Sequence, residues 1–234
     1  MNVAIVKYNA GNIYSVVNAL RRLGITPVVT DNAEELMNAD KVLFPGQGEA
    51  RTAMEYLRSH NLDEVIRCLR QPVLGICVGQ QLLCRHSEEG DTDCIGIFPM
   101  DVHRFVPTRH EDKIPQMGWN KIFNLRTPLF NPSELAQLTD SRNPSELAPL
   151  TDSRNPSGLD PLTGRKATTV EENSYVYFVH SYYVPLHDEY TIATAGFTLP
   201  YSAAIHKDNF YATQFHPEKS GSVGEKILQN FIDL

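Results

Sequence analysis

The chain alternates short apolar runs with segments whose apolar residues recur at helical spacing. Runs such as VAIVKY (3–8) and VLGI (73–76) have the length of a buried strand. The segment after the first run has apolar residues three and four apart and ends at Gly24, which favours a helix with a glycine cap. Strands that alternate with helices are typical of an α/β sheet whose strands are largely parallel.

The same reading extends along most of the chain. It predicts strands at 3–8, 27–30, 42–44, 73–76, 175–184, 191–195, 202–206 and 210–216. It predicts helices at 12–23, 49–60, 62–70, 78–85 and 221–234, and one that Asp31 caps and that runs to about Ala39. From about 94 to 124 the pattern gives short strands and no long helix. We therefore expect an α/β domain with a central mixed, mostly parallel sheet flanked by helices.

A repeat interrupts this pattern. Residues 131–142 read NPSELAQLTDSR and 143–154 read NPSELAPLTDSR, and a decayed third copy, NPSGLDPLTGR, follows at 155–165. Each unit has two leucines and no valine, isoleucine or aromatic residue, so it buries little apolar surface against the entropy of ordering. We expect one domain over 1–234, interrupted by a flexible insertion at about 131–165 that carries no catalytic residue.

Composition narrows the function classes. The formal net charge is −7 and no basic stripe is present, which argues against nucleic acid as a partner. No apolar run approaches the ~20 residues of a membrane span, and the N-terminal residues do not have the pattern of a signal peptide. Four cysteines without a CxxC pair are ordinary in a reduced compartment. We expect a cytoplasmic enzyme.

Cys77 is the candidate nucleophile. It lies in Gly75-Ile76-Cys77-Val78-Gly79, where a predicted strand meets a predicted helix. Glycines on both sides of the residue permit the tight turn of a nucleophile elbow, and the start of a helix favours a thiolate. The alternative is a buried structural cysteine. The other three cysteines, Cys68, Cys84 and Cys94, lack this context.

A base and a residue that orients it follow in His216-Pro217-Glu218, at the end of the last predicted strand. In an extended segment positions i and i+2 point to the same side, so Glu218 can hold the imidazole while His216 activates the thiol. The motif is weak when taken alone, because any of the eight histidines can be a surface residue.

Glycines at a strand end supply the third element. In Pro45-Gly46-Gln47-Gly48 a flexible backbone can offer N–H groups to an oxyanion, with the N–H of Val78 as a further donor. A simple turn is the alternative. The GxGxxG and Walker patterns of phosphate-binding loops are absent from the sequence.

These motifs together resemble the class I, triad-type glutamine amidotransferases. More narrowly, the chain is similar to the glutaminase subunits of imidazole glycerol phosphate synthases over nearly its whole length except roughly 127–172. GICVGQQLL and HPE are shared with sister glutaminases, whereas MGWN and HPEKSG are more specific. The segments that carry the similarity are YNAGN (8–12), PGQG (45–48), GICVGQQLL (75–83), FPMDVHRF (98–105), IPQMGWN (114–120), YFVHSYY (177–183) and QFHPEKSG (214–221).

The resemblance implies a flavodoxin-like glutaminase architecture without cofactor or metal. It implies hydrolysis of glutamine to glutamate and ammonia through a cysteine thioester. It further implies that the ammonia passes to a (β/α)8-barrel cyclase in a heterodimer. There it would yield imidazole glycerol phosphate and an aminoimidazole carboxamide ribonucleotide, a step of histidine biosynthesis.

The resemblance also assigns residues beyond Cys77, His216 and Glu218. It implies an oxyanion loop at Gly46, Gln47 and Gly48. It implies binding of substrate glutamine by Gln81, His180, Ser181 and Tyr182. It implies contact with the cyclase through Met117, Trp119, Asn120 and Lys219, although a lone tryptophan can also be a core residue.

The chain departs from the family pattern at two positions. Gln47 replaces the usual valine in the oxyanion loop, and Gln116 replaces the usual histidine before MGWN. Two other functions stay open at this point: the glutaminase of a different synthase, and a stand-alone cysteine hydrolase of γ-glutamyl compounds or peptides. A binding module with an inactive triad is disfavoured because all three triad residues are present.

Overall fold

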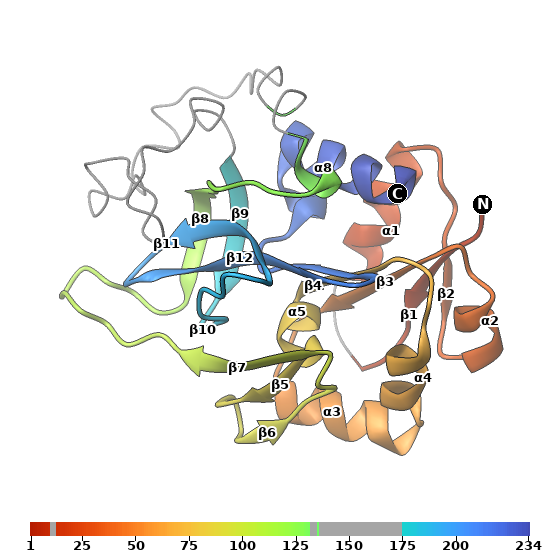
Figure 1. Cartoon of the computed structure of the whole chain (residues 1–234), viewed down its shortest axis with the longest axis horizontal. Helices are drawn as coiled ribbons and strands as arrows, with labels where there is room; N and C mark the ends of the chain where they lie inside the picture. The colour runs from red at the N-terminus through yellow and green to blue at the C-terminus, as the bar shows by residue number, and fades with distance from the viewer. Residues whose placement is uncertain (10–12, 132–134, 136–174) are drawn as a thin grey trace.

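The computed structural model describes residues 1–9, 13–131, 135 and 175–234 (Figure 1). Its strands are β1 (Val3–Val6), β2 (Val28–Thr30), β3 (Lys41–Gly46), β4 (Val73–Cys77), β5 (Cys84–Ser87), β6 (Thr92–Asp93), β7 (Phe98–Arg104), β8 (Gln116–Lys121), β9 (Tyr175–His180), β10 (Tyr182–Tyr183), β11 (Thr191–Gly196), β12 (Pro200–Lys207) and β13 (Phe210–Thr213). Its helices are α1 (Ile13–Arg22), α2 (Ala33–Met37), α3 (Ala50–Ser59), α4 (Leu62–Cys68), α5 (Val78–Leu83) and α8 (Gly221–Asp233), with 3-10 turns η1 (Pro128–Phe130) and η4 (Pro217–Lys219).

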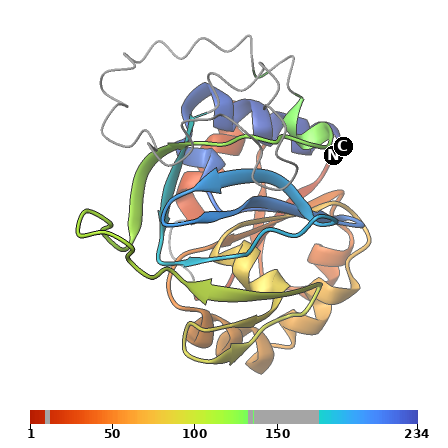
Figure 2. The same ribbon diagram turned by 60° about the vertical axis from the view of Figure 1, so that its left-hand side comes forward.

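A seven-stranded mixed sheet forms the centre of the molecule. Its order is β11-β12-β13-β4-β3-β1-β2, and the five strands from β13 to β2 are parallel. Beyond β13 the sheet continues with β12 and the edge strand β11, and both of these pairings are antiparallel. Helices α1 and α8 lie on one side of this sheet and α3, α4 and α5 on the other (Figures 1 and 2). The predicted fold class is therefore confirmed.

Two smaller sheets flank the central one. The first has the order β10-β7-β5-β6, and the second is the antiparallel pair β8-β9. Strand β8 precedes the predicted insertion, whereas β9 and β10 follow it. None of the helices in the described ranges is both long and apolar enough to cross a membrane.

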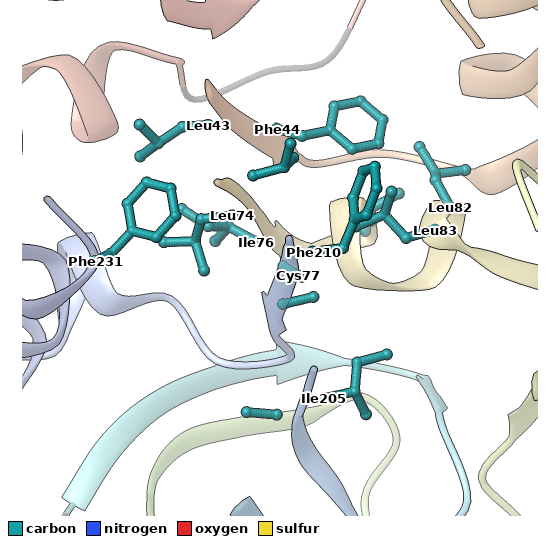
Figure 3. Close-up of a cluster of buried hydrophobic side chains, with 14 of the residues drawn as sticks. Leu43, Phe44, Leu74, Ile76, Cys77, Leu82, Leu83, Ile205, Phe210 and Phe231 are labelled. Atoms are coloured by element: carbon teal, nitrogen blue, oxygen red, sulfur yellow. The ribbon is translucent and has the colours of Figure 1, made fainter. Parts of the chain in front are cut away.

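The core surrounds the middle strands of the central sheet. Every residue of β1, β3 and β4 is buried, as expected for parallel strands that are covered on both faces. Figure 3 shows side chains of β3 and β4, such as Phe44 and Leu74, in the same cluster as Phe231 of α8 and Leu83 of α5. Cys77 is drawn in this cluster, at the end of β4.

Most predicted elements agree with the observed ones. The single strand predicted at 175–184 is wrong, because the chain leaves β9 at Ser181 and continues as β10, which pairs with β7 in a different sheet. The short strands β5 and β6 were not predicted, and the other differences lie at the ends of elements.

Helix α2 is capped by Asn32, not by Asp31: the Asn32 Oδ1 atom accepts from the N–H groups of Glu34 at 2.9 Å and Glu35 at 3.1 Å. Helix α5 ends at Leu83 and not at residue 85, because the chain turns there into β5, which pairs with β7.

Most of the predicted insertion at 131–165 lies outside the described residues. Two of its residues are described. The N–H of Leu135 donates to the carbonyl oxygen of Asn131 at 3.0 Å, and the Leu135 side chain is buried in the core. We retain the single domain with an insertion as a proposal.

Close packing of α8 fixes the turn that carries Glu218. Helix α8 follows η4 directly, and a Cβ atom added to Gly224 would overlap the carbonyl oxygen of Pro217. The Ser220 hydroxyl also donates to the carbonyl oxygen of His216 at 2.6 Å. A side chain larger than glycine at position 224 must therefore push η4 away from the helix.

Gly224→Ala is expected to lower the free energy of unfolding by about 1–3 kcal/mol, the usual cost of overpacking. The shift of η4 should also reduce activity, because Glu218 lies in that turn. Thermal or denaturant unfolding measures the first effect. Ser222→Ala, at an exposed position of the same helix, is the control and should change stability by less than about 0.5 kcal/mol. Equal stability of the two variants would contradict the packing argument.

Candidate active site

Three neighbouring parallel strands end at one place in the sheet. Gly46 at the end of β3 is paired with Cys77 at the end of β4, and on the other side of β4 Thr213 of β13 is paired with Ile76. The chain beyond β13 therefore delivers His216 beside Cys77. Ligands in open α/β sheets bind outside the carboxyl ends of the strands, and the predicted triad lies at that edge.

Cys77 adopts a strained backbone conformation. Its φ of 56° and ψ of −111° lie outside the regions that side chains normally allow, as expected for a nucleophile elbow. The glycines around it permit close contact between β3 and the turn. A Cβ atom on Gly79 would overlap the Phe44 carbonyl oxygen, and one on Gly46 would lie 2.5 Å from the Gly79 nitrogen. The glycine after Cys77 in GxCxG is therefore required because the backbone of β3 lies too close to leave room for a side chain.

His216 and Glu218 form a buried pair. The Nδ1 atom of His216 lies 2.8 Å from Oε1 of Glu218, and both side chains are almost fully buried. Burial lowers the pKa of His216, but the charge and hydrogen bond of the Cys77 sulfur and the carboxylate of Glu218 outweigh it, so that the pKa is raised. Because Nδ1 of His216 bonds to Glu218, Nε2 is the nitrogen that can exchange a proton with the Cys77 sulfur.

Two further groups contact the Cys77 sulfur. The Sγ atom lies 3.8 Å from the carbonyl oxygen of Val179 and 3.7 Å from Nε2 of Gln214. The Oε1 atom of Gln214 accepts from Nε2 of Gln81 at 3.0 Å, so Gln214 presents its N–H to the sulfur. An N–H donor stabilises the thiolate form of a cysteine.

A cavity of about 380 Å³ opens at this edge of the sheet. It contains most of the predicted catalytic, oxyanion and glutamine-binding residues. Its lining is Gln47, Gly48, Cys77, Val78, Gln81, Glu89, Pro115, Val179, His180, Ser181, Tyr182 and His216. Gly46 and Glu218 do not line it: Gly46 lies behind the turn at Cys77 and Glu218 lies behind His216.

The end of β3, just before the predicted oxyanion loop, is held by Tyr8. The Tyr8 hydroxyl donates to the carbonyl oxygen of Pro45 at 2.6 Å. Burial raises the pKa of Tyr8, and the nearby Cys77 raises it further, so the phenol stays protonated and remains a donor. Beyond this anchor, Gly48 has a φ of +113°, a conformation that favours glycine.

Sequence reasoning missed Glu89. Its carboxylate accepts from the N–H of Ala50, the first residue of α3, at 2.8 Å, and it lines the cavity. Burial raises its pKa, and the bond from Ala50 opposes that shift. Glu89 is the second of two adjacent glutamates in a polar turn, and no motif distinguished it from Glu88. Gln214 was also missed, although it immediately precedes the Phe-His-Pro-Glu segment.

The four residues predicted to face a partner lie together on β8 and η4. The Met117 side chain is 58% exposed. Trp119 packs on Tyr177, with 6.1 Å between the two ring centroids. The Lys219 ammonium also lies over the Tyr177 ring, 5.9 Å from its centroid. Asn120 is buried, and its Nδ2 atom donates to the carbonyl oxygen of Gly196 at 2.7 Å. Asn120 thus holds in place strand β8, which carries Met117 and Trp119.

Comparison with known proteins agrees with this geometry. The profile of the family "Glutamine amidotransferase class-I" matches residues 4–234. The chain is 52% identical to the imidazole glycerol phosphate synthase subunit HisH of Bacteroides thetaiotaomicron, with both chains covered completely. It is 37% identical to the protein of the same name from Salmonella typhimurium, again over the full length of both.

Solved structures share the fold at low sequence identity. A putative GMP synthase subunit from Thermoplasma acidophilum matches with a TM-score of 0.64 at 21% identity, covering 100% of this chain and 93% of that one. The structure of PurLQS from Thermotoga maritima matches with a TM-score of 0.62 at 15% identity, covering 99% and 97%. The chain belongs to the class-I glutamine amidotransferases and, within them, to the family of imidazole glycerol phosphate synthase HisH subunits.

Proposed function

We propose that this chain is the glutaminase subunit of an imidazole glycerol phosphate synthase. The observation that carries the proposal is the position of Cys77 on a strained turn, in one cavity with His216, whose Nδ1 atom is 2.8 Å from Glu218. A nucleophile, a base and a residue that orients the base are the parts that acyl transfer requires. Membership of the HisH family supports glutamine as the acyl donor.

We infer that the reaction begins from a thiolate and imidazolium pair, in which His216, whose pKa is raised, holds the proton of the Cys77 thiol. The thiolate attacks the side-chain amide carbon of glutamine, and the new C–S bond converts the carbonyl oxygen to an oxyanion. The N–H of Val78 and the backbone of Gln47 and Gly48, which line the same cavity, are the donors that stabilise this oxyanion. Protonated His216 gives its Nε2 proton to the amide nitrogen, the C–N bond breaks, and ammonia leaves a γ-glutamyl thioester.

Hydrolysis of the thioester restores the enzyme. Neutral His216 takes a proton from water as the water oxygen attacks the thioester carbon. The C–S bond then breaks, glutamate leaves, and the thiolate and imidazolium of the resting pair form again. Glu218 stabilises the imidazolium in the resting state and holds the ring orientation throughout, through its bond to Nδ1.

Substrate recognition needs groups that match both ends of glutamine. Both amide hydrogens of Gln81 are used, toward the Tyr182 carbonyl oxygen at 3.2 Å and toward Oε1 of Gln214 at 3.0 Å. Its Oε1 atom therefore acts as an acceptor for substrate. Glu89 supplies a carboxylate for the α-ammonium group. Segment 180–182 forms the wall along which the substrate lies.

The partner we propose is a (β/α)8-barrel cyclase, which receives the ammonia in a cytoplasmic heterodimer. Trp119 and Lys219 pack on Tyr177, and the exposed Met117 lies on the same strand as Trp119. Asn120 holds that strand, β8, in place through its bond to Gly196. Exposed methionine and aromatic side chains of this kind are enriched at protein interfaces. Ammonia made at Cys77 can be used without loss only if the partner covers the site.

Cys77→Ala tests the nucleophile in the complex with the cyclase. Synthesis from glutamine should fall by about 10³-fold or more because the thioester cannot form. Synthesis from added ammonia should stay within twofold, roughly, because the cyclase is intact. Cys68→Ala removes an exposed thiol and is the matched control, which should retain both activities. Equal loss of both activities in Cys77→Ala would contradict the assigned role.

Glu218→Gln tests the electrostatic role of the carboxylate. His216 must carry a proton to release ammonia, and its raised pKa keeps that proton until the pH rises well above the ordinary imidazole value. Activity should therefore fall as the pH rises through the pKa of His216 in the folded protein. Loss of the Glu218 charge lowers that pKa, so the alkaline limb of kcat/KM for glutamine should move to lower pH.

The control for this pH profile is Glu225→Gln, which removes an exposed carboxylate paired with Arg22. Its alkaline limb should coincide with that of the unmodified protein. An alkaline limb that stays in place in Glu218→Gln would contradict the proposed interaction.

Glu89→Gln tests recognition of the α-ammonium group. Loss of a charged hydrogen bond typically costs about 1.5–3 kcal/mol, so the KM for glutamine should rise by about 10–100-fold with a smaller change in kcat. Steady-state glutaminase kinetics of the complex measure both constants. Glu88→Gln changes the adjacent, exposed carboxylate and should leave the KM unchanged. A KM that is the same in both variants would exclude Glu89 from the substrate site.

A further inference from the structure

A continuous series of buried polar groups leads from Gln116 to the Cys77 sulfur. The Tyr201 hydroxyl lies 3.0 Å from Oε1 of Gln116 and 3.3 Å from Nε2 of His180. The Nδ1 atom of His180 lies 2.7 Å from the carbonyl oxygen of Tyr182. All the side chains in the series are buried: Gln116, Tyr201, His180, Gln81, Gln214 and Cys77.

The series continues through two amides to the nucleophile. The same Tyr182 carbonyl oxygen accepts from Nε2 of Gln81 at 3.2 Å, and Gln81 also donates to Oε1 of Gln214 at 3.0 Å. The Nε2 atom of Gln214 is 3.7 Å from the Cys77 sulfur. We call this series, from Gln116 to Cys77, the buried relay.

The carbonyl oxygen of Tyr182 fixes the direction of the bonds on both sides of it. A carbonyl oxygen only accepts, so Nδ1 of His180 must carry a hydrogen. His180 is neutral, because burial is the main cause that lowers its pKa, to about 4, and the nearby His216 lowers it further. The rings of Phe105, Phe178 and Tyr201 surround it. Nε2 is therefore an acceptor.

The Tyr201 hydroxyl has one hydrogen and can donate it either to His180 or to Gln116. Within the part of the chain that the structure describes, this hydroxyl is the group that can donate to Nε2 of His180. If it donates there, its oxygen needs a donor from Gln116. A half-turn about the last side-chain bond of Gln116 exchanges Oε1 for Nε2 and supplies that donor. If Tyr201 instead donates to Gln116, the buried Nε2 of His180 is left without a hydrogen-bond partner, which is unfavourable for a buried polar atom.

We propose that Gln116 is a positioning residue that donates to Tyr201, keeps the Tyr201 hydrogen on Nε2 of His180 and thereby sets the direction of the buried relay. Through His180 it holds the Tyr182 carbonyl oxygen, and that oxygen holds the amide of Gln81. The effect on glutamine binding rests on the proposed function, whereas the tautomer of His180 does not.

The test measures the ring nitrogens of His180 in the full chain by ¹⁵N–¹H correlation NMR at neutral pH. The signals are assigned by their loss in His180→Gln. The unmodified protein should show a neutral ring with hydrogen on Nδ1 and none on Nε2. A hydrogen on Nε2, with or without one on Nδ1, would overturn the proposal.

Two substitutions of Gln116 give opposite NMR results. At a pH at which the new carboxyl group is ionised, Gln116→Glu offers only acceptors, takes the hydrogen of Tyr201 and should bring a second hydrogen onto the His180 ring. Gln116→His can donate an N–H to Tyr201, so the signals of His180 should match those of the unmodified protein. Unchanged His180 signals in Gln116→Glu would overturn the proposal.

Kinetics in the complex with the cyclase provide the second measurement. Gln116→Met removes one bond of the relay and Tyr201→Phe removes two, and each should raise the KM for glutamine by about fivefold or more, with a smaller effect on kcat. Gln116→His should restore the KM. Tyr183→Phe removes a hydroxyl from the same aromatic cluster outside the relay and is the control, with no change expected. An unchanged KM in Gln116→Met would show that Gln116 does not position the substrate site.

The two measurements separate this proposal from the proposed function. A protein that has the predicted His180 tautomer but does not hydrolyse glutamine in the complex would refute the function and leave the relay intact. A protein that hydrolyses glutamine but has hydrogen on Nε2 of His180 would refute the relay and leave the function intact.

Discussion

Close backbone contact between the ends of β3 and β4 is the constraint on which the rest of this site depends. The contact exists because Gly46 and Gly79 have no side chain where the two segments meet. It allows the chain to turn sharply at Cys77, whose φ of 56° is a conformation that costs about 1–3 kcal/mol for a residue other than glycine. The buried strands on both sides offset this cost, and the sulfur is held at the edge of the sheet.

Two buried histidines near this turn have opposite electrostatic states. His216 faces the Cys77 sulfur and the Glu218 carboxylate, so its pKa is raised despite burial. His180 lies among aromatic rings with a carbonyl oxygen as its partner, so burial dominates and its pKa falls to about 4. The first can therefore carry a proton for the leaving group. The second is a neutral structural element that orients the wall of the cavity.

Local pattern predicted most of the fold, and short motifs predicted most of the cavity lining. Strands such as β1 and β4 are continuous apolar runs, which predict buried strands. Cys77 lies in a GxCxG sequence, and glycines that flank a residue at a strand end predict a tight turn without knowledge of the rest of the fold. Glu89 and Tyr201 could not be predicted in this way. Glu89 lies in the turn after β5 and reaches the cavity beside the first residue of α3, and Tyr201 meets Gln116 across 85 positions of sequence. Contacts of this kind depend on tertiary structure.

The central claim is that the sheet places Cys77 as the residue that forms a covalent bond to glutamine. The most direct measurement is mass spectrometry of the complex with its cyclase, quenched in acid during turnover of glutamine and digested into peptides. The account predicts a mass increase of one γ-glutamyl group on the peptide that contains Cys77. A γ-glutamyl group on another residue, or no such adduct during turnover, would contradict it.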